Sequence, residues 1–173
     1  MSNENNEKLY SIKSFFDKIN LFFHGILAVP LTVFGWLFLE AKDGRYSTVE
    51  VDNMDVFNFL GPIVIFGIVG ISFSLFKKKL RKIDNHLPLQ EKLENYLKCS
   101  WIKFIGLELA LILSVLGYYL TFTNTFVAMF MIVLVFFSLS KPTPYRVVES
   151  LQLKDDEKDS VVNKVKKDER LIN

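Results

Sequence analysis

The sequence contains only one cysteine, Cys99, among its 173 residues. An intrachain disulfide is therefore impossible, and quinone-linked thiol oxidases are excluded because these membrane enzymes need pairs of cysteines. The chain also has little excess charge, with a formal net charge of +2. So small an excess does not indicate nucleic-acid binding, and we expect no nucleic-acid partner.

Histidine is scarce as well, since the chain has only His24 and His86. A haem b bundle needs two axial histidines inside it, and His86 falls in a polar connection. Di-iron membrane oxidases need repeated glutamate and histidine ligands, which the apolar runs lack. The chain has no P-loop, no alcohol-phosphotransferase motif and no motif that would make a serine a nucleophile beside His24. We therefore expect no catalytic residue, no cofactor and no metal site, and a protein that is not an enzyme.

What the chain does have is long apolar runs: half of its residues are hydrophobic, and 17 of them are phenylalanine. Four runs of about bilayer length alternate with dense charge, which is typical of helical membrane proteins. A soluble core would instead distribute its apolar residues with a helical or strand period. This pattern predicts an all-α integral membrane four-helix bundle. The expected spans are residues 19–39, 56–76, 101–122 and 124–140.

The polar segments complete a single membrane domain over residues 1–173. We expect a polar N-terminal tail over residues 1–18 and a charged cytoplasmic C-terminal tail over residues 141–173. In the C-terminal tail, Thr143 is placed to cap a short amphipathic helix whose first residue is Pro144.

Two connections between the runs carry local signals. Residues 46–51 are compatible with a short strand or with extended chain. Pro88 precedes a short amphipathic helix over residues 89–97, which can run directly into the third span. Trp101 and Lys103 then mark the membrane interface, as an aromatic belt residue and a snorkelling cation.

Lysine and arginine are concentrated on alternate connections, and these residues determine the orientation of a membrane protein. The connection 77–100 and the C-terminal tail are rich in them, whereas the connections 40–55 and 121–124 are poor in them. This asymmetry predicts a multi-pass protein of the cell inner membrane with both termini in the cytoplasm.

Glu108 lies inside the third run and is the strongest indication of function. A charged carboxylate near the centre of a bilayer costs roughly 2.5–3.5 kcal/mol or more, so it is rarely accidental. His24 is expected at a similar depth in the first span, and Ser72, Ser74 and Ser138 in the same layer; these five residues form a candidate intramembrane polar site. A Glu108–His24 pair could bind a proton or a cation. Alternatively, both side chains only fix the packing of the helices, or Glu108 contacts a partner subunit.

Small residues recur with helical spacing along three of the runs, which lets another helix approach closely. These stripes are Gly25, Ala28, Thr32 and Gly35 in the first run, Gly67, Gly70 and Ser74 in the second, and Gly106, Ala110, Ser114 and Gly117 in the third. Glu108 lies about 165° around the third helix from its stripe. Two opposite sides unsuited to lipid predict that this helix is central or contacts another protein. The fourth run has no such stripe, so we expect it at the periphery.

The second half of the chain resembles a group of small, uncharacterised bacterial four-span membrane proteins. The residues that carry the resemblance are Leu93, Glu94, Tyr96, Glu108, Lys141, Pro142, Thr143 and Pro144. The group has no established activity, so the resemblance implies a four-span architecture and no specific function.

The sequence as a whole predicts a small, non-enzymatic membrane subunit or scaffold that associates through small-residue helix faces. Its expected partners are the lipid bilayer and either further copies of itself, in a homo-oligomer, or a larger membrane complex. The alternative is a small proton- or cation-coupled transporter that uses Glu108 together with His24.

Overall fold

The computed structural model describes residues 2–44, 54–84, 87–154, 157–159 and 161–162. These residues are helical or lie in turns, and no strand occurs among them. The helices are α1 (Ser2–Lys42), α2 (Met54–Leu80), α3 (Leu89–Thr121), α4 (Asn124–Leu139) and α5 (Pro144–Leu151). The all-helical prediction is therefore confirmed for the described part of the chain. The strand considered for residues 46–51 lies outside it.

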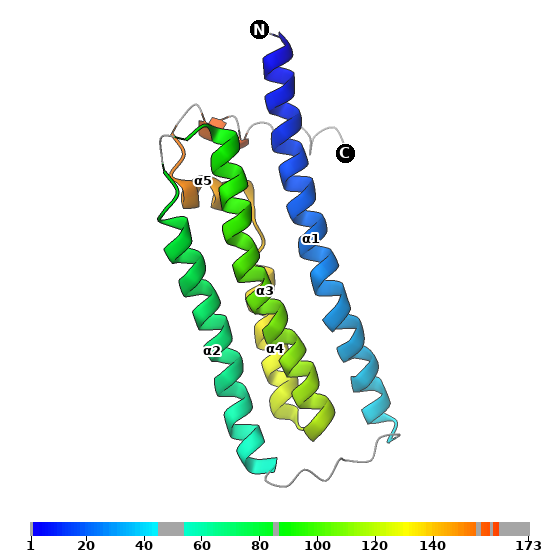
Figure 1. Ribbon diagram of the computed structural model, residues 1–173. Helices are drawn as coiled ribbons and strands as arrows, with labels where there is room; N and C mark the ends of the chain where they lie inside the picture. The colour runs from blue at the N-terminus through cyan, green and yellow to red at the C-terminus, as the bar shows by residue number, and fades with distance from the viewer. Residues whose placement is uncertain (1, 45–53, 85–86, 155–156, 160, 163–173) are drawn as a thin grey trace.

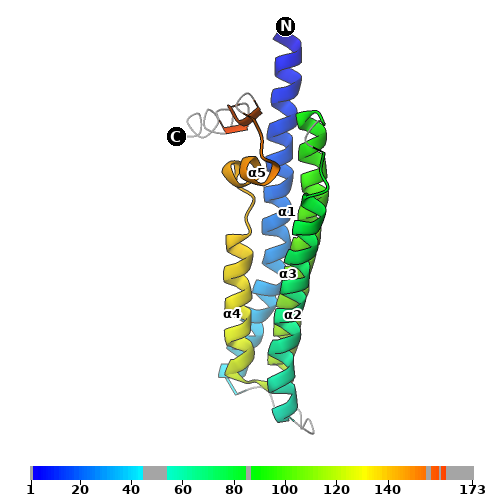
Figure 2. The same cartoon turned by 90° about the vertical axis from the view of Figure 1, so that its left-hand side faces the viewer.

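α3 is the central helix of the bundle. It contacts each of the other four helices, and it runs in the same direction as α1 and opposite to α2 and α4 (Figure 1). α5 lies across the end of the bundle at which α2 ends and α3 begins, and α1 projects beyond the bundle at this same end (Figures 1 and 2). α3 therefore has neighbours on both of its lipid-averse sides, with Gly106 packed against α2, Gly117 against α4 and Glu108 beside α1.

The two longest helices extend beyond the predicted spans. α3 has 33 residues, and the amphipathic segment predicted at residues 89–97 continues without a break into the apolar run. α1 has 41 residues and contains Pro30 without interruption. The polar N-terminal segment, predicted as a tail over residues 1–18, is therefore part of the first helix from Ser2 onward.

Three helices are long and apolar enough to cross a bilayer: Phe16–Lys42, Asp55–Leu80 and Leu89–Thr121. α4 is shorter, with 16 residues, which is about 24 Å of helix at 1.5 Å per residue. It reaches the length of a span only together with α5, which is bent away from it by 76°. The described residues therefore contain three candidate spans, or four if this bent pair counts as one.

α4 buries one face in the core and leaves the other exposed, with Met131, Val135 and Leu139 more than half exposed. Phe126, Phe130 and Phe137 on α4 are among the most completely buried side chains of the described part. The Phe130 ring stacks on Phe34 of α1 at 3.9 Å between centroids, and Phe137 meets Phe23 at 4.9 Å. Large aromatic side chains dominate core energetics through the area that they bury. α4 consequently contributes phenylalanine side chains to the same core that holds Phe23 and Phe34 of α1.

α3 and α4 form the predicted antiparallel hairpin. Phe122 ends α3 in a left-handed conformation, with φ of 47°, and α4 begins two residues later. The Thr123 hydroxyl donates a hydrogen bond to Asn58 Oδ1 of α2 at 2.9 Å. This bond connects the tight turn to the beginning of the second helix.

α5 begins as the sequence predicts. The Thr143 side chain accepts a hydrogen bond from the Arg146 backbone N–H, and Pro144 occupies the first turn. Val147 and Leu151 are buried, which fixes the amphipathic helix against the end of the bundle.

An ion pair holds the segment after α5 against α3. Lys92 Nζ lies 2.9 Å and 3.0 Å from the two carboxylate oxygens of Glu157, and the Lys92 side chain is largely buried. Removing one partner of such a pair leaves the other charge desolvated and unpaired. We expect Glu157→Gln to loosen residues 157–162 by about 1–3 kcal/mol, measured as faster amide hydrogen exchange there. Exchange within α2 should not change, and an unchanged rate at residues 157–162 would contradict the prediction.

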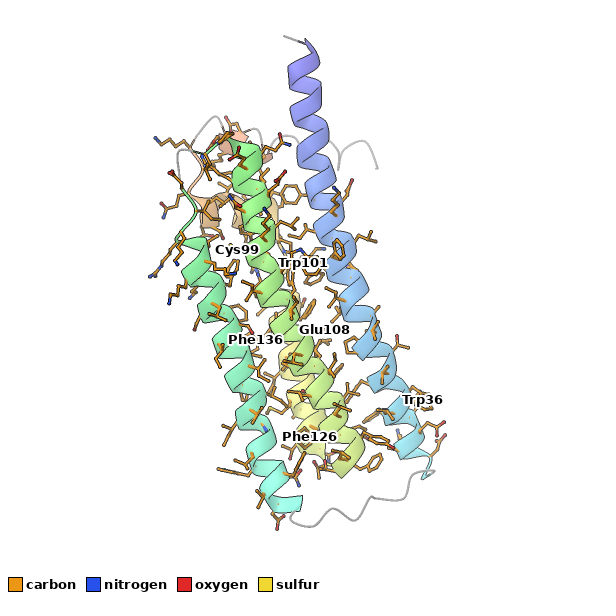
Figure 3. The ribbon with its side chains drawn as sticks, viewed as in Figure 1. Trp36, Cys99, Trp101, Glu108, Phe126 and Phe136 are labelled. Atoms are coloured by element: carbon orange, nitrogen blue, oxygen red, sulfur yellow. The ribbon has the colours of Figure 1, made fainter. Side chains whose placement is uncertain are left out.

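The single thiol reports on folding. Cys99 is free and buried on α3, near the end of the bundle covered by α5 (Figure 3). Exchange or labelling of a buried group requires local or global opening. We therefore expect a maleimide to label Cys99 slowly in the native protein and at least tenfold faster after denaturation, measured by mass spectrometry. Equally fast labelling of the native protein would show that this region is not packed as described.

Candidate functional site

Glu108 lies on the side of α3 that runs beside α1 (Figure 3). It borders a pocket of about 540 Å³, the Glu108 pocket, whose other lining residues are Leu21, Phe22, Gly25, Ile26, Val29 and Ile105. The side chain is half-buried, and no described residue bonds its buried Oε2 atom. A buried polar atom without a partner is costly and calls for an explanation. Glu108 is thus the one polar group in an otherwise apolar recess between two helices.

His24 does not join Glu108. Its side chain is exposed, and its Nδ1 atom lies 2.7 Å from the backbone carbonyl oxygen of Asn20, one turn earlier on α1. Its ring meets only the edge of Phe23 among the described aromatic contacts. α1 presents Gly25 to the Glu108 pocket, so the neighbouring His24 points to a different side of the helix.

The three serines of the predicted polar site also lie apart from Glu108. Ser72 is buried and donates a hydrogen bond to the Ile68 carbonyl oxygen, whereas Ser74 is exposed and donates to the Gly70 carbonyl oxygen. Ser138 is exposed on α4. Each of the described serine bonds is made to its own helix, and none of these serines lines the Glu108 pocket.

The small-residue stripe of α3 lies inside the bundle. Gly106 packs against Ser72 of α2, and Gly117 packs against the Phe126 ring of α4. Ala110 and Ser114, between these glycines, are fully buried. Gly61 of α2 also faces the Phe126 ring, a contact that sequence reasoning missed because Gly61 belongs to no stripe.

The stripes of α1 and α2 have no counterpart inside the chain. A side chain at Gly25, Gly35, Gly67 or Gly70 would meet no atom within 4 Å. Ala28 and Thr32 on α1 are exposed, as is Ser74 on α2. These two faces remain open on the surface of the described bundle.

A second pocket, of about 430 Å³, was not predicted. This Lys103 pocket lies between α2, α3, the end of α4 and α5, and is lined by Phe76, Tyr96, Lys103, Ser140, Arg146, Glu149 and Ser150. Lys103 is only 6% exposed. Its Nζ donates a hydrogen bond to the Ser140 carbonyl oxygen at 3.1 Å and lies over the Phe76 ring at 4.8 Å.

Lys103 is therefore not the snorkelling cation that the sequence predicted. α3 begins well before it, and α5 folds over it from far along the chain. Trp101 meets Phe22 of α1, with 4.8 Å between ring centroids, so it also has a neighbour within the bundle. No local signal could have shown the pocket, because Arg146 and Ser150 follow Lys103 by more than forty residues.

No known family, curated protein or solved structure matches this chain. The resemblance of its second half to small bacterial four-span proteins stays a prediction. Among the described residues there is no group of three or more histidine, cysteine, aspartate or glutamate side chains that could hold a metal ion. The described residues offer two candidate binding features, a carboxylate in an apolar recess and a cationic pocket at one end of the bundle.

Proposed function

We propose that this chain is a multi-pass protein of the cell inner membrane with both termini in the cytoplasm. Large apolar side chains such as Leu21, Phe59 and Ile71 are more than 60% exposed on α1 and α2, and contiguous apolar surface of this kind favours a lipid environment. α2 ends at the same end of the bundle at which α1 starts and α5 lies (Figure 1). The last turn of α2 and the residues that follow it form an exposed cationic cluster of Lys77, Lys78, Lys79, Arg81 and Lys82. Cationic residues at that end favour the cytoplasmic side.

Within the membrane, the proposed function is that of a non-enzymatic subunit or scaffold, which associates with further copies of itself or with a larger complex. The observation that carries this proposal is the contrast between glycines. The glycines of α3 are filled by neighbouring side chains, whereas Gly25, Gly35, Gly67 and Gly70 face open space. Close approach at small residues drives helix association in membranes, where apolar contact alone gives little advantage. We also propose that the chain belongs with the small bacterial four-span proteins that it resembles.

The test is a gentle affinity purification from native membranes, in which the mass and the co-purifying proteins are determined. We expect the wild type to carry a stoichiometric partner or a second copy. The amount of this partner or copy recovered with Gly70→Ile should be at least tenfold lower. Leu75→Ile is the matched control, because it places the same residue at an exposed position of α2 outside the stripe. A wild-type monomer without partners would overturn the proposal.

A second candidate function, proton- or cation-coupled transport, is favoured by the unbonded Oε2 of Glu108 beside an open pocket. A carboxylate in an apolar recess is a natural binding group for a proton or a cation. The exposed position of His24 argues that Glu108 would act without it. This function requires that Glu108→Gln abolish flux in liposomes while His24→Gln retains it, with assembly intact in both variants. Absence of flux in the wild type would exclude it.

A further inference from the structure

α3 carries two buried lysines, and only one has an anionic partner in the described part of the chain. Lys92 is paired with Glu157 at 2.9 Å. Lys103, three turns further on, donates to a backbone carbonyl oxygen and lies between the Phe76 and Phe104 rings. An ammonium group has three donors, so the Ser140 carbonyl uses one and leaves two. A buried cation without an anion is unfavourable unless a charge partner completes its surroundings.

α5 brings a second cation to the same place. Arg146, Glu149 and Ser150 stand three and four residues apart and therefore share one face of this helix. That face lines the Lys103 pocket, while Val147 and Leu151 bury the other face. Arg146 is exposed and makes no ion pair with any described residue. Its planar fork of donors suits an oxygen anion. The hydroxyl groups of Tyr96 and Ser150 also line the pocket and are hydrogen-bonded to each other.

We propose that the Lys103 pocket binds a phosphate group, with Lys103 as the buried point charge and Arg146 as the donor at its mouth. Two cations and one carboxylate, Glu149, leave a single net positive charge in the lining. This balance suits a singly charged phosphodiester better than a doubly charged phosphate monoester. The pocket is lined by α5, which lies at the end of the bundle where α2 ends (Figure 1), and the lysine cluster belongs to that end of α2. An anionic phospholipid headgroup is therefore the favoured source of the phosphate, and free phosphate is the other source to be tested.

The lipid source rests on the proposed membrane location, which membrane fractionation tests separately. The full chain is purified in detergent, and native mass spectrometry counts retained lipids after addition of phosphatidylglycerol or phosphatidylcholine. In parallel, thermal unfolding is followed with added phosphatidylglycerol or with inorganic phosphate, because a ligand of the native state raises the unfolding temperature. The test variant is Arg146→Gln, since Arg146 is exposed and its loss leaves the core intact. Lys98→Gln is the matched control, as it removes an exposed cation from α3 outside the pocket.

We expect wild type and Lys98→Gln to retain one phosphatidylglycerol, and Arg146→Gln to bind it about tenfold more weakly. Phosphatidylcholine should not replace it, because its headgroup has no net charge. Stabilisation by inorganic phosphate that is lost in Arg146→Gln would support the site and assign it to a soluble phosphate. If neither ligand distinguishes Arg146→Gln from Lys98→Gln, the proposal is wrong.

Glu149→Gln tests the charge argument independently. Removing the carboxylate raises the net positive charge of the lining, so we expect inorganic phosphate to bind at least tenfold more tightly than in the wild type. The variant changes an exposed side chain and should fold normally. Unchanged phosphate binding in Glu149→Gln would overturn the assignment of this pocket to phosphate.

Discussion

Gly106→Ile is expected to destabilise the fold by about 3 kcal/mol. A Cβ atom at this position would overlap both the hydroxyl and the Cβ atom of Ser72, and the Ser72 backbone Cα lies at 3.8 Å. α2 and α3 would have to move apart along the stripe that joins them. Overpacking a close helix contact costs about 1–3 kcal/mol, occasionally more, and we expect the upper end here. That loss is a large fraction of a typical stability of about 5–15 kcal/mol.

The measurement is labelling of Cys99 across a denaturant series, because this thiol is buried only in the folded chain. The matched control is Gly70→Ile on α2, where the added side chain meets no atom within 4 Å. Its free energy of unfolding, obtained from the labelling series, should stay within about 0.5 kcal/mol of the wild-type value. Its association should be weaker than that of the wild type. Equal losses of stability in the two variants would mean that the helices do not pack through Gly106.

These two variants also show what the sequence could predict. Periodicity placed small residues on three helices and predicted that α3 is central or contacts another protein, since both Gly106 and Glu108 lie on sides unsuited to lipid. It could not tell which stripe is used within the chain and which is left open, because that depends on the rotation of each helix. The buried face of the fourth helix could not be predicted for a related reason. From the sequence alone, Phe126 and Phe137 suggest a helix that faces lipid. Their neighbours, among them Gly61 and Gly117, are known only from the structure.

The neighbours of the polar side chains likewise depend on the rotation of each helix. Equal depth in the bundle suggested a Glu108–His24 pair, but one residue of rotation on α1 brings Gly25 to the pocket instead of His24. The Lys103 pocket is formed by segments more than forty residues apart. The face of α5 that lines it could not be recognised from the sequence, because it depends on the packing of α5 against α3. Sequence reasoning therefore located the helices well and the side-chain neighbours poorly.

Glu108→Leu is expected to stabilise the isolated chain and to weaken its assembly. The carboxylate has a buried oxygen without a partner in the described structure, and removal of such an unsatisfied group is worth about 1–3 kcal/mol. The leucine would also match the apolar lining of the Glu108 pocket. Thermal unfolding of the purified chain measures the first effect, and recovery of partners from native membranes measures the second.

Ser138→Leu is the control, because it removes an exposed polar side chain of α4 that does not line the Glu108 pocket and should change neither property. Gain of stability with loss of partners would mean that Glu108 is retained at a cost to the isolated chain, as expected for a contact completed by another subunit. Gain of stability with assembly intact would leave ion binding as the reason for keeping the carboxylate, and liposome flux would decide it. A loss of stability in Glu108→Leu would contradict both, since it would make Glu108 a packing residue whose partner lies within the chain itself.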